Sequence, residues 1–165
     1  MSLLLNGAKT MTIAGTEMQC IEIYTGESYT LPFTFTYANT VPIDCSGWSL
    51  STDAKFYNID TVTYPTLDEV ILGNLSLLDP QPTSSGYSTL DAAFTNAALG
   101  QGYIYVPDTL TGGFGSPDPT PIIDLANSGA NSTLVIITMG VSRTDVLSGL
   151  INYNKEPFGI IVRYQ

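Results

Sequence analysis

The most regular alternation of apolar and polar positions lies between Gly26 and Tyr57. Its first half predicts a β-strand with one aromatic face and one threonine-rich face, because successive side chains of a strand point to opposite sides. The aromatic face holds Tyr29, Leu31, Phe33, Phe35 and Tyr37. After a turn over residues 38–47 the pattern returns, with Trp48, Leu50, Thr52, Ala54 and Phe56 on one side. These two strands are expected to share one core. Pro32 has no amide proton, so it predicts a sheet edge or a bulge at that point.

Other segments repeat the two-residue period. Strands are predicted at Met18–Tyr24, Gly102–Val106 and Phe158–Tyr164, and further β-prone runs lie at 59–64 and 70–78. Residues 132–140 carry apolar side chains at consecutive positions, which predicts a central strand covered on both faces.

Two segments favour helices. Leu90–Leu99 is rich in alanine and is followed by Gly100, a residue that commonly ends helices. Ser142–Leu150 has Ser142 and Asp145 three residues apart ahead of an apolar group, a weak capping signal. Residues 152–157 are expected to form a turn before the last strand.

The chain of 165 residues fits one domain. Residues 1–17 have weak periodicity and are predicted to be an extended N-terminal arm, whereas residues 18–165 form the folded domain. The expected fold is mostly β: a single-domain antiparallel β-sandwich of the Ig-like or Greek-key kind with one or two short helices.

Charge is scarce and acidic. Charged residues make up 12% of the chain and the net charge is −10, against about 25% charged residues in ordinary globular proteins. Binding to nucleic acid is excluded, because a phosphate-binding surface needs clustered Lys and Arg. No stretch is long and apolar enough to span a membrane. Short neutral polar groups cost little to desolvate, so this composition suits a chain that packs against neighbours.

The residue types leave little room for catalysis. The chain has no histidine, which removes the commonest general base and the imidazole metal ligands. Asp68 and Glu69 are adjacent and would point to opposite faces, so they are a poor catalytic pair. The acids Asp108, Asp118 and Asp124 flank a long Gly/Pro loop without EF-hand spacing. No catalytic residue, metal or cofactor is therefore predicted, and the protein is expected not to be an enzyme.

The two cysteines, Cys20 and Cys45, could pair if their strands are neighbours, or they could serve as small core residues in a reducing compartment. Three aromatic residues fall in predicted loops and not at core positions: Tyr64, Tyr87 and Phe114. They are the candidate partner-binding residues, either for another protein or, by stacking on sugar faces, for a glycan.

The stretch from Gly26 to Phe56, which includes the first long strand, resembles a known family. The residues that carry the resemblance are Gly26-Glu27, the run Phe33-Thr34-Phe35-Thr36, the turn Val41-Pro42-Ile43-Asp44, and Ser46-Gly47-Trp48 before Ala54-Lys55-Phe56. They are similar to the N-terminal domain of phage tail and baseplate proteins, such as the baseplate upper proteins of siphophages. Cys45 departs from the family, which has Leu or Val in that turn.

The resemblance implies a bacteriophage virion structural protein, made in the host cytoplasm and placed in the tail, baseplate, neck or fibre attachment. Its expected partners are other virion proteins and copies of itself, in a homo-oligomer. The alternative from another class is a glycan- or receptor-binding module on a virion or cell surface.

Overall fold

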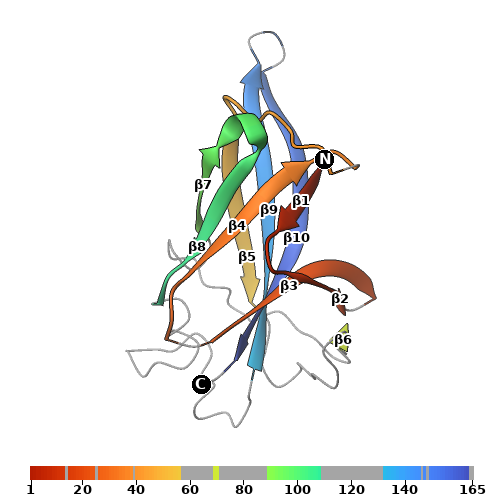
Figure 1. The fold of residues 1–165 in the computed structure, drawn as a ribbon, viewed down its shortest axis with the longest axis vertical. Coiled ribbons are helices and arrows are strands. Elements are labelled where there is room, and N and C mark those ends of the chain that lie inside the picture. Colours follow the sequence, from red (N-terminus) through yellow and green to blue (C-terminus); the bar gives the residue numbers. More distant parts are fainter. Residues whose placement is uncertain are drawn as a thin grey trace.

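Two β-sheets pack face to face (Figure 1). The structure, a computed structural model, describes residues 1–13, 15–24, 26–38, 40–56, 69–70, 89–108, 132–145, 147 and 149–163. The four-stranded sheet has the order β1 (Ser2–Leu5), β4 (Tyr29–Thr36), β8 (Gln101–Val106) and β7 (Asp91–Asn96). The six-stranded sheet has the order β5 (Ser49–Phe56), β9 (Ser132–Asp145), β10 (Gly149–Arg163), β3 (Thr16–Tyr24), β2 (Lys9–Ile13) and β6 (Glu69–Val70).

The predicted β-sandwich is confirmed, and the alternating patterns explain it. Leu31, Phe33 and Phe35 of β4 are buried between the sheets, whereas Pro32 is exposed. On the facing sheet the alternate residues Thr52, Ala54 and Phe56 of β5 are buried. The segment between β4 and β5 thus carries the chain from one sheet to the other, and both strands contribute to one core.

Two pairings depart from the antiparallel expectation. β3 and β10 are parallel neighbours, with Cys20 opposite Gly159 and Ile23 opposite Val162. The short pair β2 and β6 is parallel as well. A two-residue period places side chains on faces but contains no information on the direction of a neighbouring strand.

The N-terminal arm expected over residues 1–17 is wrong. β1 pairs with β4 and β2 pairs with β3, so this segment supplies a strand to each sheet. Leu3, Leu5, Met11 and Ile13 are all buried. The hydrophobic gain from burying these side chains outweighs the entropy lost on ordering a short terminus.

Pro32 fits because β1 is short. β4 lies inside its sheet, but the pairing with β1 stops at Leu5, which lies opposite Phe33. Beyond it the Asn6 amide donates to the Pro32 carbonyl at 2.9 Å. The missing proton of Pro32 therefore faces the side where β1 has already ended.

The helix predicted over Leu90–Leu99 is also wrong. Asp91–Asn96 is the edge strand β7, followed by the one-turn 3₁₀ helix η2 (Ala97–Leu99) and by Gly100 in the left-handed conformation at φ 63°. Phe94 explains the difference, because the centroid of its ring lies 6.2 Å from that of Phe33 and 6.3 Å from that of Phe35. Contacts of this kind with the core override a weak alanine preference for helix.

The second predicted helix, Ser142–Leu150, is a β-hairpin. β9 runs to Asp145 and β10 begins at Gly149, which has a φ of 74°. The predicted turn at 152–157 lies within β10, where the pairing with β9 shifts between Asn152 and Asn154. The apolar spacing suggested a helix face, yet Leu147 projects from the hairpin tip with 95% of its surface exposed.

The central strand predicted at 132–140 is confirmed, and it reveals a second apolar cluster. β9 lies between β5 and β10, with Val135 and Ile137 facing the other sheet and Leu134 on the outer face. Leu134 joins the buried residues Met11, Ile13, Cys20 and Ile161 there. Gly159 makes this possible, because a Cβ at that position would lie 2.8 Å from the Cys20 sulfur and 3.2 Å from Ile13 Cδ1.

Candidate functional site

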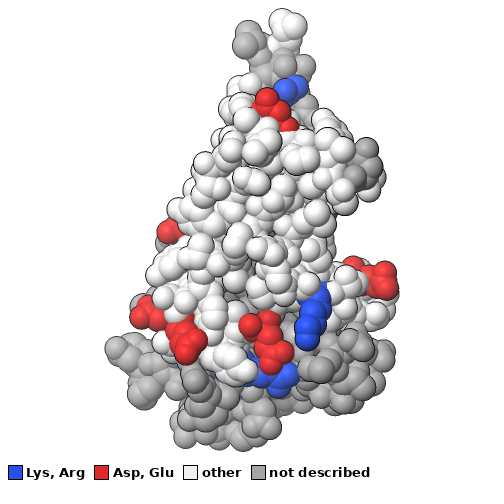
Figure 2. Space-filling model, viewed as in Figure 1, with Lys and Arg blue, Asp and Glu red and all other residues white. Residues whose placement is uncertain are grey.

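The outer face of the four-stranded sheet carries almost no charge. Among the residues of β1, β4, β7 and β8, Asp91 is the only acid and there is no base. These strands lie in front of the six-stranded sheet in Figure 1. Figure 2 shows the same side, with most charged groups toward the two ends and one acidic group at the left edge between them. In a chain of net charge −10, another protein surface that approaches these four strands meets a single carboxylate, that of Asp91.

Exposed apolar groups lie on this face. Leu4 is 43% exposed and Tyr105 is 37% exposed, and Pro32 is exposed between their strands. Strand register places Tyr103 opposite Pro32 and Tyr105 opposite Thr30. Tyr103 and Tyr105 point outward, as the alternation in 102–106 predicts, because Ile104 and Val106 are buried. Tyrosine side chains with an apolar ring and a polar tip are common at protein interfaces.

A groove of about 580 Å³ opens on the same face beside the tyrosines. Its lining includes Leu4, Pro32, Thr34, Pro42, Thr95 and Gln101. None of these residues carries a charge, and the hydroxyl and amide groups can both donate and accept hydrogen bonds. The groove therefore suits a neutral, partly apolar ligand or side chain.

The segment after β4 extends the apolar rim of the face. Tyr37 is 56% exposed and Val41 is 49% exposed. The loop is nonetheless well fixed, because the Tyr37 amide donates to the Val41 carbonyl and the Thr40 amide donates to the Tyr37 carbonyl, both at 2.9 Å. Thr40 has a φ of 67°, a conformation that is costly for a β-branched residue and is here held by those bonds.

The edge of the face at β1 is closed by side chains from the other sheet. The Leu3 amide donates to Glu156 Oε2 at 2.6 Å, and the Leu5 amide donates to Gln19 Oε1 at 2.8 Å. The side-chain amide of Gln19 also donates to the Leu3 carbonyl. Gln19 thus bonds to β1 as a neighbouring strand would. The Leu3 amide and carbonyl and the Leu5 amide are therefore already hydrogen-bonded and cannot pair with a strand of another chain, which is the usual hazard of an exposed sheet edge.

A second tie lies on the β5 and β7 side. The Thr52 hydroxyl donates to the Leu90 carbonyl at 2.8 Å and accepts from the Leu90 amide at 2.7 Å. Thr52 is buried, so both backbone groups next to β7 are satisfied away from water. The two sheets are therefore joined by hydrogen bonds on both sides as well as by the core.

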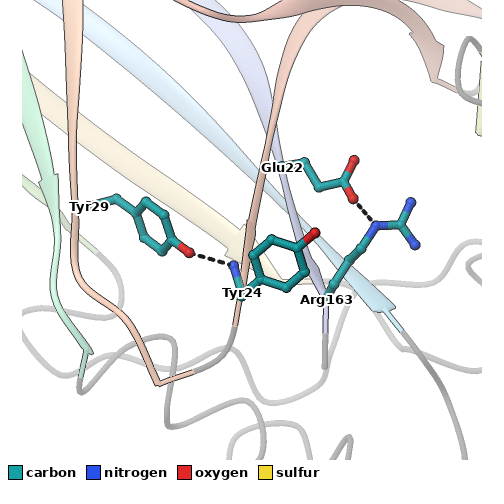
Figure 3. Close-up of polar contacts among 4 residues, drawn as sticks. All are labelled: Glu22, Tyr24, Tyr29 and Arg163. Atoms are coloured by element: carbon teal, nitrogen blue, oxygen red, sulfur yellow. Dashed lines mark hydrogen bonds and ion pairs between the residues drawn. The ribbon is translucent and has the colours of Figure 1, made fainter. Parts of the chain in front are cut away.

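Polar side chains connect the strands at the end where β3 stops (Figure 3). The Tyr24 amide donates to the Tyr29 hydroxyl at 2.9 Å, and that hydroxyl donates to Glu27 Oε2 at 2.7 Å. Burial raises the pKa of the Tyr29 phenol above its ordinary value. Glu22 and Arg163 form an ion pair between the parallel strands β3 and β10. These contacts join β3 to β4 and β3 to β10, which is a structural role.

The cysteines behave as core residues. Both are free and buried, in agreement with one of the two alternatives derived from the sequence. Burial raises the pKa of Cys20 to about 11, so its thiol is neutral near pH 7 and is a poor nucleophile. Burial, with a contribution from the neighbouring Asp44, also raises the pKa of Cys45.

The sequence-predicted binding residues Tyr64, Tyr87 and Phe114 lie outside the described residues. Asp68, Asp118 and Asp124 lie outside them too, whereas Asp108 is exposed just after β8. Within the described ranges, no three His, Cys, Asp or Glu side chains gather in a way that could hold a metal ion. The same ranges contain no helix long and apolar enough to cross a membrane.

The pattern of any single strand does not reveal the uncharged face. Its residues come from four separate segments, and only the sheet order brings Leu4, Thr34, Gln101 and Thr95 together around one groove. A sequence signal did exist, because residues 28–43 and 92–107 contain no charged residue.

Comparison with known proteins adds little. No family model matches the chain, and no curated protein matches it in sequence. Among solved structures, it is similar to AggA, the major subunit of aggregative adherence fimbriae type I from Escherichia coli. The identity is 9% and the TM-score is 0.30, over 99% of this chain and 96% of that chain.

Proposed function

We propose that this chain is a structural protein of a bacteriophage virion, in the tail, baseplate, neck or fibre attachment. It acts by protein–protein assembly through the outer face of the four-stranded sheet. The observation that carries the proposal is the combination of exposed Leu4 and Tyr105 with an almost complete lack of charge on that face. The virion setting rests on the resemblance of residues 26–56 to phage tail and baseplate domains.

The chemistry of the face favours assembly. Threonine, tyrosine and proline lose little hydration energy when another surface covers them, whereas lysine and carboxylate side chains lose much more. Interface cores in proteins are likewise depleted in charge and enriched in aromatic residues. An exposed, uncharged sheet face of this kind has the composition of an interface.

The test is to purify virus particles from the source of the chain and to quantify its peptides by mass spectrometry against the major capsid protein. We expect tens to hundreds of copies per particle, as symmetric or repeated placement requires. Absence of the chain from particles would contradict the virion proposal.

The groove supports a second candidate, a glycan- or receptor-binding module. Its volume of about 580 Å³ and its neutral hydroxyl and amide lining suit an uncharged sugar. A glycan array probed with the wild-type chain and with Gln101→Ala would test it. Binding that is lost in Gln101→Ala, or in Phe114→Ala for the loop predicted from the sequence, would favour this function, and no binding to any neutral glycan would remove it.

A further inference from the structure

We infer that the partner of the uncharged face is a second copy of the same chain, paired by two-fold symmetry with Tyr105 of each copy seated in the groove of the other. This inference rests on the proposed function, because it names the partner of the same surface. It is carried by the charge distribution and by the shape of the face.

Charge determines which surfaces of two copies can meet. Each copy carries a net charge of −10, so two copies repel each other through most orientations. The strands of the six-stranded sheet all carry charged residues: Lys9, Glu17, Glu22, Asp53, Lys55, Glu69, Arg143, Asp145, Lys155, Glu156 and Arg163. Among the residues of its four strands, the four-stranded sheet brings one charged residue of each copy to the contact, Asp91, which lies opposite Tyr105 across β7 and β8.

The face carries both a projection and a recess. Tyr105 projects from β8 at the level of Thr30, and Gln101 lines the groove at the level of Thr34. These two levels are four residues apart on one strand, or about 14 Å. Midway between them lie Pro32 on β4, Tyr103 on β8 and Ala93 on β7, which are consecutive partners across the sheet.

We place a two-fold axis between the two facing sheets, perpendicular to the strands and at the level of Pro32, Tyr103 and Ala93. This axis makes the face complementary to itself. In an isologous contact, residue i of one copy meets residue j of the other and the reverse also holds. The axis places β8 over the partner's β8, so Tyr105 lies over the partner's Gln101 and the groove receives the ring. Ala93, close to the axis, then faces its own counterpart.

The size of the face predicts a modest affinity. Strands of 4, 8, 6 and 6 residues, with a rise of about 3.4 Å per residue and a spacing of about 4.8 Å, present roughly 400 Å² per copy, below the usual ~800 Å² of a stable interface. The exposed Tyr37 and Val41 beside the face can add area. Pairing is therefore expected at high concentration or in a repeated assembly, where many weak contacts act together.

Sedimentation equilibrium of the purified chain tests the pairing. We expect a concentration-dependent dimer that strengthens with added salt, because salt screens the repulsion between acidic copies. Tyr105→Asp and Gln101→Glu should each weaken dimerisation at least tenfold, since each places a carboxylate in the contact. Ser51→Asp adds the same charge on an exposed position of β5 and is the matched control. Thermal unfolding followed by circular dichroism should show that all three variants are folded.

The geometry has a separate test. Ala93→Cys leaves Tyr105 and the groove intact, and a short bismaleimide should link it into covalent dimers, whereas Ser51→Cys should not be linked. A wild-type monomer at the highest attainable concentration, or a dimer that Tyr105→Asp and Gln101→Glu leave unchanged, would overturn the inference. A monomer that is nevertheless abundant in particles would overturn the pairing alone, and a dimer absent from particles would overturn the virion function alone.

Discussion

The two sheets of this sandwich treat their outer faces in opposite ways. On the six-stranded sheet, every strand carries charge, and part of the outer face is buried around Leu134 and Ile161. On the four-stranded sheet, the outer face is nearly free of charge and yet exposed, with Leu4 and Tyr105 at the surface. Exposed surfaces of single proteins usually concentrate charge. The exposed, uncharged face is therefore the surface on which the proposed assembly role rests.

The largest expected effect is a difference in stability between a substitution on the buried outer face of the six-stranded sheet and one on the exposed outer face of the four-stranded sheet. Ile161→Ala removes a side chain that is 1% exposed in the second cluster and should lower the free energy of unfolding by about 2–5 kcal/mol. Tyr105→Ala on the other outer face removes a side chain that is 37% exposed and should lower it by about 1 kcal/mol in the monomer. Urea unfolding of both variants measures the contrast, and equal losses would show that the two faces do not differ.

The next effect concerns the inner side of the four-stranded sheet. Gly102 leaves room for the Phe33 ring, and an added Cβ would collide with that ring and lie 2.5 Å from the Ala93 carbonyl oxygen. Gly102→Ala should cost about 1–3 kcal/mol through overpacking. The control is Thr95→Ala at an exposed position of β7, which should be nearly neutral in urea unfolding. A neutral Gly102→Ala would mean that Phe33 packs elsewhere.

The third effect on stability concerns the hydrogen bonds between Thr52 of β5 and the backbone of Leu90, which join the two sheets. Thr52→Val keeps the shape of the side chain but leaves the Leu90 amide and carbonyl without their partner, so it should cost about 1–3 kcal/mol. Thr52→Ser keeps the hydroxyl and should recover most of that loss. If both variants lose the same stability, the methyl group and not the hydroxyl is what stabilises the β5 and β7 side.

The smallest effect is a pH dependence from the second cluster. The pKa of Cys20 rises to about 11 in the folded state from its ordinary value of about 9, so the unfolded chain loses the thiol proton first as pH rises. Its contribution to stability is complete below pH 9 and is lost between about pH 9 and 11, by at most about 1.4 kcal/mol per pH unit. Unfolding of wild type and Cys20→Ala over this range should differ in slope, with wild type steeper. Parallel slopes would contradict the raised pKa.

The fold could largely be predicted from the sequence, because alternation reports directly on which side chains a sheet buries. The strands at 29–36, 49–56 and 101–106 follow from it. Alanine content predicts a helix at 90–99, but the contacts of Phe94 with the core favour a strand there. Apolar spacing of three to four residues predicts a helix at 142–150, but the pairing of β9 with β10 makes this segment a hairpin. The N-terminal strands have weak local patterns because both are short, and β1 in addition pairs with β4, a strand distant in sequence.

The candidate site could be predicted only in part. The alternation in 102–106 correctly places Tyr103 and Tyr105 on one side of their strand. It could not show that this side is solvent-exposed, since that depends on β1, β4 and β7 joining the same sheet. The hydrogen bond between Leu5 and Gln19 joins residues 14 positions apart, and the one between Leu3 and Glu156 joins residues 153 positions apart. No local sequence pattern indicates either of these bonds.

Hydroxyl-radical footprinting of the chain, free in dilute solution and assembled in virus particles, tests the role of the uncharged face most directly. We predict that oxidation of Leu4, Tyr103 and Tyr105 falls several-fold on assembly, while the exposed Leu147 at the hairpin tip serves as an internal reference and stays reactive. Unchanged oxidation of Leu4 and Tyr105 in the assembled chain would contradict an assembly role for this face.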